Sequence, residues 1–133
     1  MRRLFFSSAV LLAAWPVLAD ESPLKVSELS VCLDVVDRAC QAPSRSFAAD
    51  VSSVSCLSRI EGATGDAYVT HVWSFEGKEV RRAKLPVKTS TFRTWSSKKV
   101  KGLPGAWKVE VLDPLDRSIG VVDFVVEPRK EGP

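Results

Sequence analysis

Short apolar or alternating runs of residues, separated by turn-forming residues, fill this chain from residue 26 onward. No segment of a dozen residues has the apolar period of a helix. The runs have the length and alternation of β-strands, and groups such as Glu76-Gly77 and Leu103-Pro104-Gly105 mark turns between them. We therefore predict an all-β fold, a single immunoglobulin-like β-sandwich of about seven short strands. The expected strands cover residues 29–36, 54–60, 67–75, 79–87, 91–97, 106–112 and 119–126.

The N-terminal residues have the pattern of a secretory signal peptide. Arg2 and Arg3 precede an apolar core over residues 4–14, and the segment ends in Val17-Leu18-Ala19. We predict cleavage after Ala19 and a periplasmic or secreted protein. The paired arginines leave the twin-arginine export route open beside the general secretory route. The apolar core is shorter than the about 20 residues that a membrane-spanning helix needs, so we expect no transmembrane span in the mature chain.

A length of 133 residues fits one domain. We divide the chain into a signal peptide (1–19), an N-terminal extension (20–30), the β-sandwich domain (31–127) and a polar tail (128–133). Residues 42–53 lack a clear strand pattern, and we expect an ordered loop there around Phe47.

Alternation along the predicted strands assigns side chains to faces. Successive side chains of a strand point to opposite sides, which places His71 and Trp73 on one face together with Val69. The same pattern turns Trp107 and Phe124 toward the interior. We therefore expect the structural core to contain His71, Trp73, Trp107 and Phe124.

The charge of the chain is unevenly placed. Residues 78–101 contain nine basic residues and one acid, Glu79, for a local charge of +8. Without Arg2 and Arg3 the mature chain has 17 Lys and Arg against 16 Asp and Glu, so the rest of the mature chain carries −7. Such a field favours an anionic partner. Basic residues on edge strands also prevent aggregation between strands, and this second reading stays open.

Five short motifs resemble a known bacterial family. They are His71-Val72-Trp73, Leu85-Pro86-Val87, Arg93-Thr94-Trp95-Ser96-Ser97-Lys98, Gly105-Ala106-Trp107-Lys108-Val109-Glu110-Val111 and Asp123-Phe124-Val125-Val126. Together they resemble the family catalogued as domain of unknown function 2914, over roughly residues 31–126. The resemblance implies an exported or membrane-tethered envelope domain and carries no established activity. The chain departs from the family at Cys40, where proline is more usual, and at residues 113–117, where a glycine-containing turn is expected.

The three cysteines all lie in the predicted mature chain. In an oxidising compartment we expect at least one disulfide. Cys32 and Cys56 lie on consecutive predicted strands, and we favour a bridge between them, which would contribute about 3 kcal/mol to stability. A bridge between Cys32 and Cys40 remains the alternative, and Cys40 is otherwise the odd thiol.

His71 is the single histidine of the chain and the natural candidate for a catalytic base. With Ser96 or Ser97 as nucleophile, it would make a small periplasmic hydrolase. Its place on an apolar strand face favours a core histidine bonded to neighbouring polar groups instead, so we predict no catalytic residue. We also expect no metal and no cofactor, because the cysteines lack the short spacing of zinc ligands and the chain has no second histidine for copper.

The residues of the basic segment supply the candidate binding site. Arg93 and Trp95 share one strand face, while Ser96 and Lys98 share the other, and these types suit a groove that holds a carboxylate, phosphate or sugar. We expect the ligand-binding residues to be Arg93, Trp95, Ser96, Lys98, Arg82, Lys84 and Lys101. The sequence thus predicts a non-enzymatic module that binds or bridges an envelope component, either an anionic glycan, a lipid headgroup or a protein. The alternatives are the hydrolase and a purely structural protein-interaction domain; nucleic acid is not an expected partner after export.

Overall fold

Ten strands and no helix make up the part of the chain that the computed structural model describes, residues 22–130. Seven strands of eight to ten residues form most of the fold, and the other three strands are shorter. The predicted signal peptide and the last tail residues lie outside the described residues. The strands are β1 (Lys25–Cys32), β2 (Asp34–Val36), β3 (Ala39–Gln41), β4 (Ser46–Phe47), β5 (Ser53–Glu61), β6 (Ala67–Phe75), β7 (Lys78–Val87), β8 (Thr91–Lys99), β9 (Gly105–Leu112) and β10 (Ser118–Val126).

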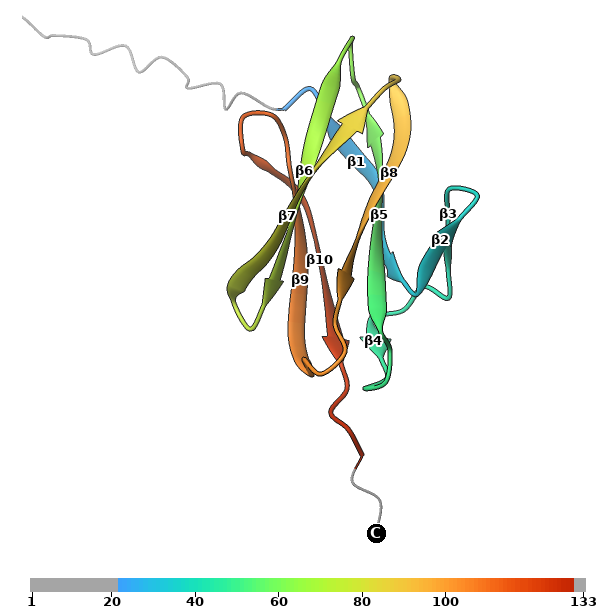
Figure 1. Cartoon of the computed structure of the whole chain (residues 1–133). Coiled ribbons are helices and arrows are strands. Elements are labelled where there is room, and N and C mark those ends of the chain that lie inside the picture. The colour runs from blue at the N-terminus through green and yellow to red at the C-terminus, as the bar shows by residue number, and fades with distance from the viewer. Residues whose placement is uncertain (1–21, 131–133) are drawn as a thin grey trace, which may run out of the picture.

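Two sheets form the layers of a sandwich (Figure 1). One sheet has the order β1-β5-β8, and the other has the order β4-β10-β9-β6-β7. All pairs in these sheets are antiparallel except the short pairing of β4 with β10. The predicted all-β sandwich is thereby confirmed.

The strand positions follow the sequence pattern closely, with three differences. The first predicted strand is interrupted at Leu33, so its end becomes the separate strand β2. Alternation extends upstream of residue 31, and the sandwich begins at Lys25 instead. The expected loop around Phe47 contains β4, where Phe47 pairs with Val126 and is buried in the core.

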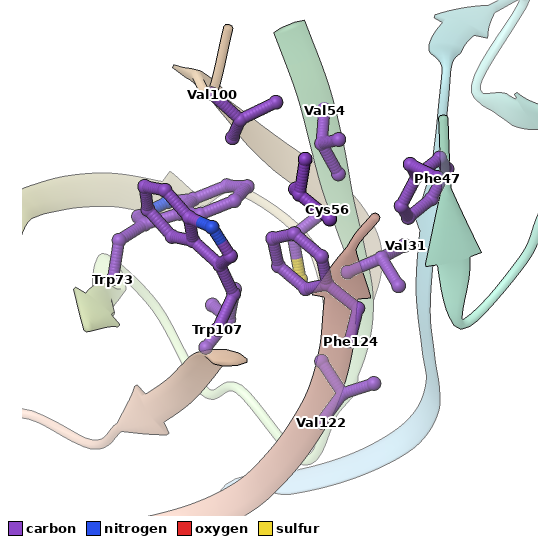
Figure 2. Close-up of a cluster of buried hydrophobic side chains, with 11 residues drawn as sticks. Val31, Phe47, Val54, Cys56, Trp73, Val100, Trp107, Val122 and Phe124 are labelled. Atoms are coloured by element: carbon purple, nitrogen blue, oxygen red, sulfur yellow. The ribbon is translucent and has the colours of Figure 1, made fainter. Parts of the chain in front are cut away.

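Aromatic rings fill the centre of the core (Figure 2). Phe124 lies with its ring centroid 5.8 Å from Trp107, 6.0 Å from Trp73 and 5.6 Å from Phe47. Valines from both sheets close the space around these rings. A second apolar cluster, with Ile60, Val69 and Val111, occupies the other end of the sandwich. The predicted core residues His71, Trp73, Trp107 and Phe124 are all buried.

The disulfide joins Cys32 to Cys40, so our preferred pairing of Cys32 with Cys56 is wrong. The reason is the register of β1 on β5, where Cys56 lies opposite Val31 and Cys32 lies opposite Ser55. The two cysteines sit on neighbouring strands but point to opposite faces of the sheet. Cys56 is a free buried thiol, and burial raises its pKa to about 12.

The bridge fastens a small hairpin, β2–β3, to the outer face of the three-stranded sheet (Figure 1). Leu57 points to this outer face and yet is only 1% exposed, because the hairpin covers the face at this point. The hairpin turn uses Asp37 and Arg38 at positive φ. It reaches β8 through a hydrogen bond from the Arg93 guanidinium to the Arg38 carbonyl oxygen.

Candidate functional site

A polar network lies between the two apolar clusters. His71 on β6 separates Val69 of one cluster from Trp73 of the other, and it is fully buried. Its Nε2 lies 2.8 Å from Ser58 Oγ on β5, and its Nδ1 lies 2.7 Å from Ser96 Oγ on β8. The imidazole therefore links both sheets of the sandwich.

The direction of the hydrogen bonds fixes the state of the ring. Trp73 Nε1–H donates to Ser96 Oγ at 2.9 Å, and Ser58 Oγ donates to the Thr94 carbonyl oxygen at 3.4 Å. Each hydroxyl has one proton, so Ser96 donates to His71 Nδ1 while His71 Nε2–H donates to Ser58. Every donor then has an acceptor. Burial lowers the pKa of His71 to about 4, which keeps the ring neutral.

Ser96 and His71 have the hydrogen bond of a nucleophile and its base, but both are enclosed. Ser96 is 5% exposed and His71 is 0% exposed, so a substrate carbonyl has no path to them without opening of the core. Ser97 points to the opposite face of β8, where its hydroxyl lies 2.8 Å from Ser55 Oγ. His71 therefore joins the two sheets and has no contact with solvent.

The two faces of β8 have different surroundings. Ser96 faces the core, so this expected ligand contact is not available on the surface. Arg93 and Trp95 face outward on the three-stranded sheet, opposite Arg59 and Leu57 of β5. The Arg93 guanidinium lies 3.7 Å from the Glu28 carboxylate, and Trp95 is 39% exposed. Arg93 is thus partly neutralised, and Trp95 is an exposed aromatic side chain beside it.

Arg82 and Lys84 lie on the outer face of the five-stranded sheet, away from Arg93 and Trp95. Both already have partners there, since Arg82 pairs with the Glu79 carboxylate at 2.7 Å and Lys84 Nζ lies 3.9 Å from the centre of the Tyr68 ring. The expected site residues are therefore spread over two opposite surfaces. They do not form one groove.

A different part of the basic segment does converge. A cleft of about 410 Å³ lies between β7 and β8, which are the free edges of the two sheets. Its lining consists of Ser53, Val80, Arg81, Ser97, Lys98 and Lys99. Three basic residues and no acidic residue line this space, and we call it the edge cleft.

A β-bulge lies at the wall of the edge cleft. The register of β6 on β7 shifts so that Trp73 pairs with Arg81 while Ser74 pairs with Glu79, which leaves Val80 as the extra residue. Arg81 pairs with Trp73 and lies on the same face, toward β8, as alternation back from Leu85 and Ala83 also places it. Arg81 was not among the expected ligand-binding residues, which on this strand were the outward-facing Arg82 and Lys84. Lys99, at the end of β8, was likewise not among the expected residues.

Lys101 lies at a second hollow, a groove of about 870 Å³ at the end of the sandwich where the chain leaves β10. Apolar walls come from Phe47, Ala48, Ala49, Pro104 and Pro128. Basic residues Lys101, Arg129 and Lys130 and acidic residues Asp50 and Glu127 complete it, and Glu127 accepts a hydrogen bond from Ser46 Oγ at 2.6 Å. We call this hollow the end groove.

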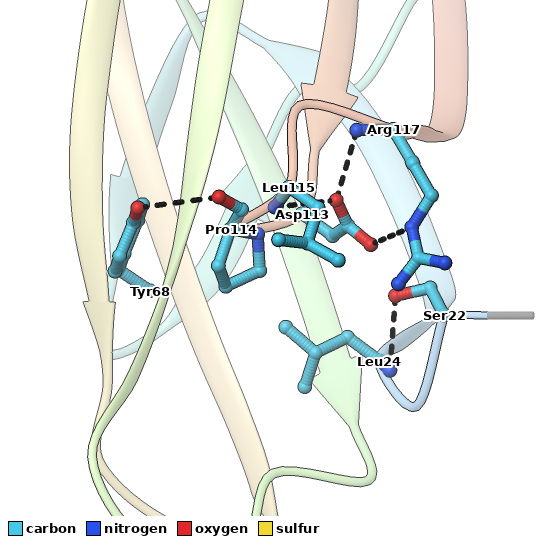
Figure 3. A network of polar contacts seen from close by, with 7 residues as sticks. All are labelled: Ser22, Leu24, Tyr68, Asp113, Pro114, Leu115 and Arg117. Atoms are coloured by element: carbon cyan, nitrogen blue, oxygen red, sulfur yellow. Dashed lines mark hydrogen bonds and ion pairs between the residues drawn. The ribbon is translucent and has the colours of Figure 1, made fainter. Parts of the chain in front are cut away.

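The turn between β9 and β10, at the opposite end of the sandwich, is stabilised by a network of polar contacts (Figure 3). Asp113 is buried, and its carboxylate accepts hydrogen bonds from the Leu115 and Arg117 amides and from Arg117 Nε, at 2.8 to 2.9 Å. Burial alone would raise the pKa of Asp113, but bonds from Ser22, Arg117 and Leu115 outweigh it and hold the pKa at about 2. Asp116 takes the positive φ of this turn, at 60°, in place of the glycine expected from the family.

No three His, Cys, Asp or Glu side chains gather as metal ligands within residues 22–130. The same residues include no helix with the length and hydrophobicity to cross a membrane.

Comparison with known proteins gives a family and weak structural likenesses. The family described as "Protein of unknown function (DUF2914)" matches residues 66–126, from the start of β6 to the end of β10. The match includes all five motifs and begins later than the resemblance that we expected from residue 31. No curated protein matches the chain.

Solved structures with some similarity include beta-glucosidase from Listeria innocua in complex with glucose, with a TM-score of 0.48 and 12% identity. A mutant of that enzyme with laminaribiose and its complex with isofagomine each give a TM-score of 0.46 and 12% identity. Each likeness covers 79% of this chain, which spans 16% of the length of those enzymes. Residues 66–126 match the DUF2914 family of unknown function, which is the family that the motifs resemble.

Proposed function

We propose that this protein is an exported, non-enzymatic binding module that holds a phosphate or carboxylate group of an anionic envelope component in the edge cleft. The observation that carries this proposal is the convergence of Arg81, Lys98 and Lys99 in a hollow that contains no acidic side chain. Positive side chains brought together cost electrostatic energy, which an anion relieves. The cleft is therefore preorganised for a ligand of negative charge.

The partners of these side chains support the same site. Among the described residues, neither Arg81 nor Lys99 makes an ion pair. Lys98 donates only to the backbone carbonyl oxygen of Lys99, at 3.2 Å. Arg82 and Arg93, by contrast, each contact a glutamate. Arg81 and Lys99 thus lie in the cleft without an ion pair, whereas Arg82 and Arg93 lie outside it and are paired.

The hydroxyl groups of the cleft suit an oxyanion. Ser53 and Ser97 line it beside the cations and can donate hydrogen bonds to phosphate or carboxylate oxygens. Arginine binds such groups with two parallel N–H donors, and the lysines add point charges. Because the cleft opens at the sandwich surface, we expect a headgroup or a chain terminus as ligand and not an enclosed small molecule.

Export is part of the proposal and is supported by the N-terminal pattern and by the disulfide between Cys32 and Cys40. We expect the mature protein to begin at Asp20. Intact mass spectrometry of protein recovered from a periplasmic fraction tests this. A mass that still includes residues 1–19 would contradict it.

The binding test uses vesicles of phosphatidylglycerol, with phosphatidylcholine vesicles as the uncharged reference. Co-sedimentation should detect binding to the anionic vesicles, and the bound fraction should fall as salt rises, because salt screens such charges within about 8 Å at physiological ionic strength. The double variant Arg81→Glu with Lys99→Glu should lose this binding.

The matched control is Arg82→Glu with Lys84→Glu. It makes the same change in net charge at exposed positions of the neighbouring outer face. Binding by the control should stay close to that of the wild type. Equal loss in both double variants would show that only net charge matters, and unchanged binding in the cleft variant would refute the site.

A further inference from the structure

We infer that the ligand is an anionic amphiphile, with an acyl chain in the end groove and a phosphate or carboxylate headgroup held between Lys101 and the edge cleft. This inference rests on the proposed function and names the class of its ligand. It follows from the position of the end groove relative to the cleft and from the chemistry of its walls.

The two hollows lie on either side of one short joint. Val100 N and Lys101 N both donate to the Ser52 carbonyl oxygen, at 3.0 and 3.4 Å, and Val100 is fully buried. Lys99 lines the cleft and Lys101 lines the groove. On the facing segment, Ser53 lines the cleft and Asp50 lines the groove. Lys99 and Lys101 are two residues apart, and two residues span at most about 7 Å, so the basic ends of the two hollows are neighbours.

The walls of the end groove suit a hydrocarbon chain. Phe47, Ala48, Ala49, Pro104 and Pro128 supply carbon surface on both sides, and a volume of about 870 Å³ lies within the usual range for a ligand pocket. Small side chains at positions 48 and 49 keep the groove open. A free anion such as inorganic phosphate would leave this apolar surface unused, whereas an amphiphile would cover it.

The charges at the rim select the sign of the headgroup. Lys101, Arg129 and Lys130 outnumber Asp50 and Glu127, and Glu127 is already bonded to Ser46. The next charges beyond the joint are the three cations of the edge cleft. A chain lying in the groove therefore has positive side chains at the end where its headgroup emerges.

Calorimetric titration of the purified protein with dodecyl phosphate, below its critical micelle concentration, tests the inference. Inorganic phosphate serves as the headgroup alone, and dodecyl maltoside serves as the chain with an uncharged head. Dodecyl phosphate should bind about tenfold or more tightly than either, with a negative heat-capacity change from apolar burial.

Ala48→Glu places a charge in the groove at an exposed position and should weaken dodecyl phosphate binding about tenfold. Pro128→Glu, on the other wall, should act in the same direction. The matched control is Ala39→Glu on the β3 hairpin, outside both hollows, which should leave binding unchanged. Melting temperatures near that of the wild type will show that these variants are folded.

Equal affinity for dodecyl phosphate and inorganic phosphate would overturn the inference, and so would undiminished binding by both groove variants. Equal affinity for dodecyl maltoside would overturn it too, because the headgroup would then play no part. In each case the proposed function stands if Arg81→Glu with Lys99→Glu still abolishes vesicle binding. It fails separately if that cleft variant binds vesicles normally.

Discussion

Ser96 is the residue on which the interior depends most. Its hydroxyl accepts from Trp73 Nε1 and donates to His71 Nδ1, so a single oxygen satisfies two buried side chains on the opposite sheet. The side chain of its neighbour Ser97 faces the surface, and its hydroxyl is hydrogen-bonded to Ser55 Oγ. Two adjacent serines of one motif therefore have different roles, set by the alternation of the strand.

We expect Ser96→Ala to lower the free energy of unfolding by about 2 to 4 kcal/mol, because two buried polar groups lose their partner. Ser97→Ala should cost less than about 1 kcal/mol, since its partner can turn to water. Urea denaturation of both variants measures the difference. Similar costs for the two serines would contradict the buried network.

His71 makes stability depend on pH in a defined window. Its pKa is about 4 in the folded protein against an ordinary 6.5, so the unfolded chain binds more protons between these values. Stability should be fully present above pH 6.5 and fall by roughly 3 kcal/mol as pH drops to 4. His71 is the only histidine, so His71→Gln should remove most of the slope between pH 6.5 and 5. An unchanged slope would show that other groups cause it.

At the scale of elements, the β2–β3 hairpin is linked to β1 by the disulfide between Cys32 and Cys40. A loop of this length contributes about 2.5 kcal/mol in the chain-entropy account. On reduction we expect faster amide hydrogen exchange in residues 34–41 and little change in β6 and β9. Mass spectrometry should find Cys32 bonded to Cys40, with Cys56 alkylated only after unfolding because burial keeps it a thiol. A bridge that includes Cys56 would contradict the register of β1 on β5.

The β9–β10 turn is the second element that one side chain maintains. Asp113→Ala removes three hydrogen bonds to a charged acceptor and should cost at least about 2 kcal/mol. Asp116→Gly should be neutral or stabilising, because glycine adopts the positive φ at that position without a steric cost. Thermal unfolding of the two variants checks both signs. A loss of stability in Asp116→Gly would show that its side chain, and not its backbone, supports the turn.

Most of the strands could be predicted because alternation and turn residues are local signals. Six of the seven predicted segments coincide with β5 to β10 to within two residues at each end. The cysteine pairing could not be predicted, because it depends on which face each strand turns outward once β1 and β5 are in register. The break at Leu33 also depends on the hairpin that folds back over the sheet.

The proposed site agrees with the charge pattern of the sequence and only partly with the residues that the sequence suggested. The sequence locates the basic segment, but it does not show that Arg81 on the inner face of β7 lies beside Lys98 and Lys99 of β8. It also treats residues 82, 84, 93 and 98 as one surface, whereas β7 and β8 belong to different sheets. Which sheet edges face each other is decided by the tertiary fold, so no local sequence pattern predicts it.

For the whole molecule, the sandwich topology explains why the basic residues of one charged segment border a common cleft. The chain passes from β7 to β8 by crossing from one sheet to the other, and the two strands separate away from their connection (Figure 1). Their basic residues therefore border one side of the sandwich, and β1 and β10 border the other side. The rest of the predicted mature chain carries the compensating negative charge.

The most direct test of this account is a titration of the ¹⁵N-labelled protein with dihexanoyl phosphatidylglycerol, followed by amide chemical shifts. We predict that the largest shifts fall on Arg81, Ser97 and Lys99, and that they shrink as salt rises. Arg82 and Lys84 should shift little, although they lie next to the cleft in sequence. Shifts centred on Arg82 and Lys84, or no shifts in the edge cleft at saturating ligand, would contradict the central claim.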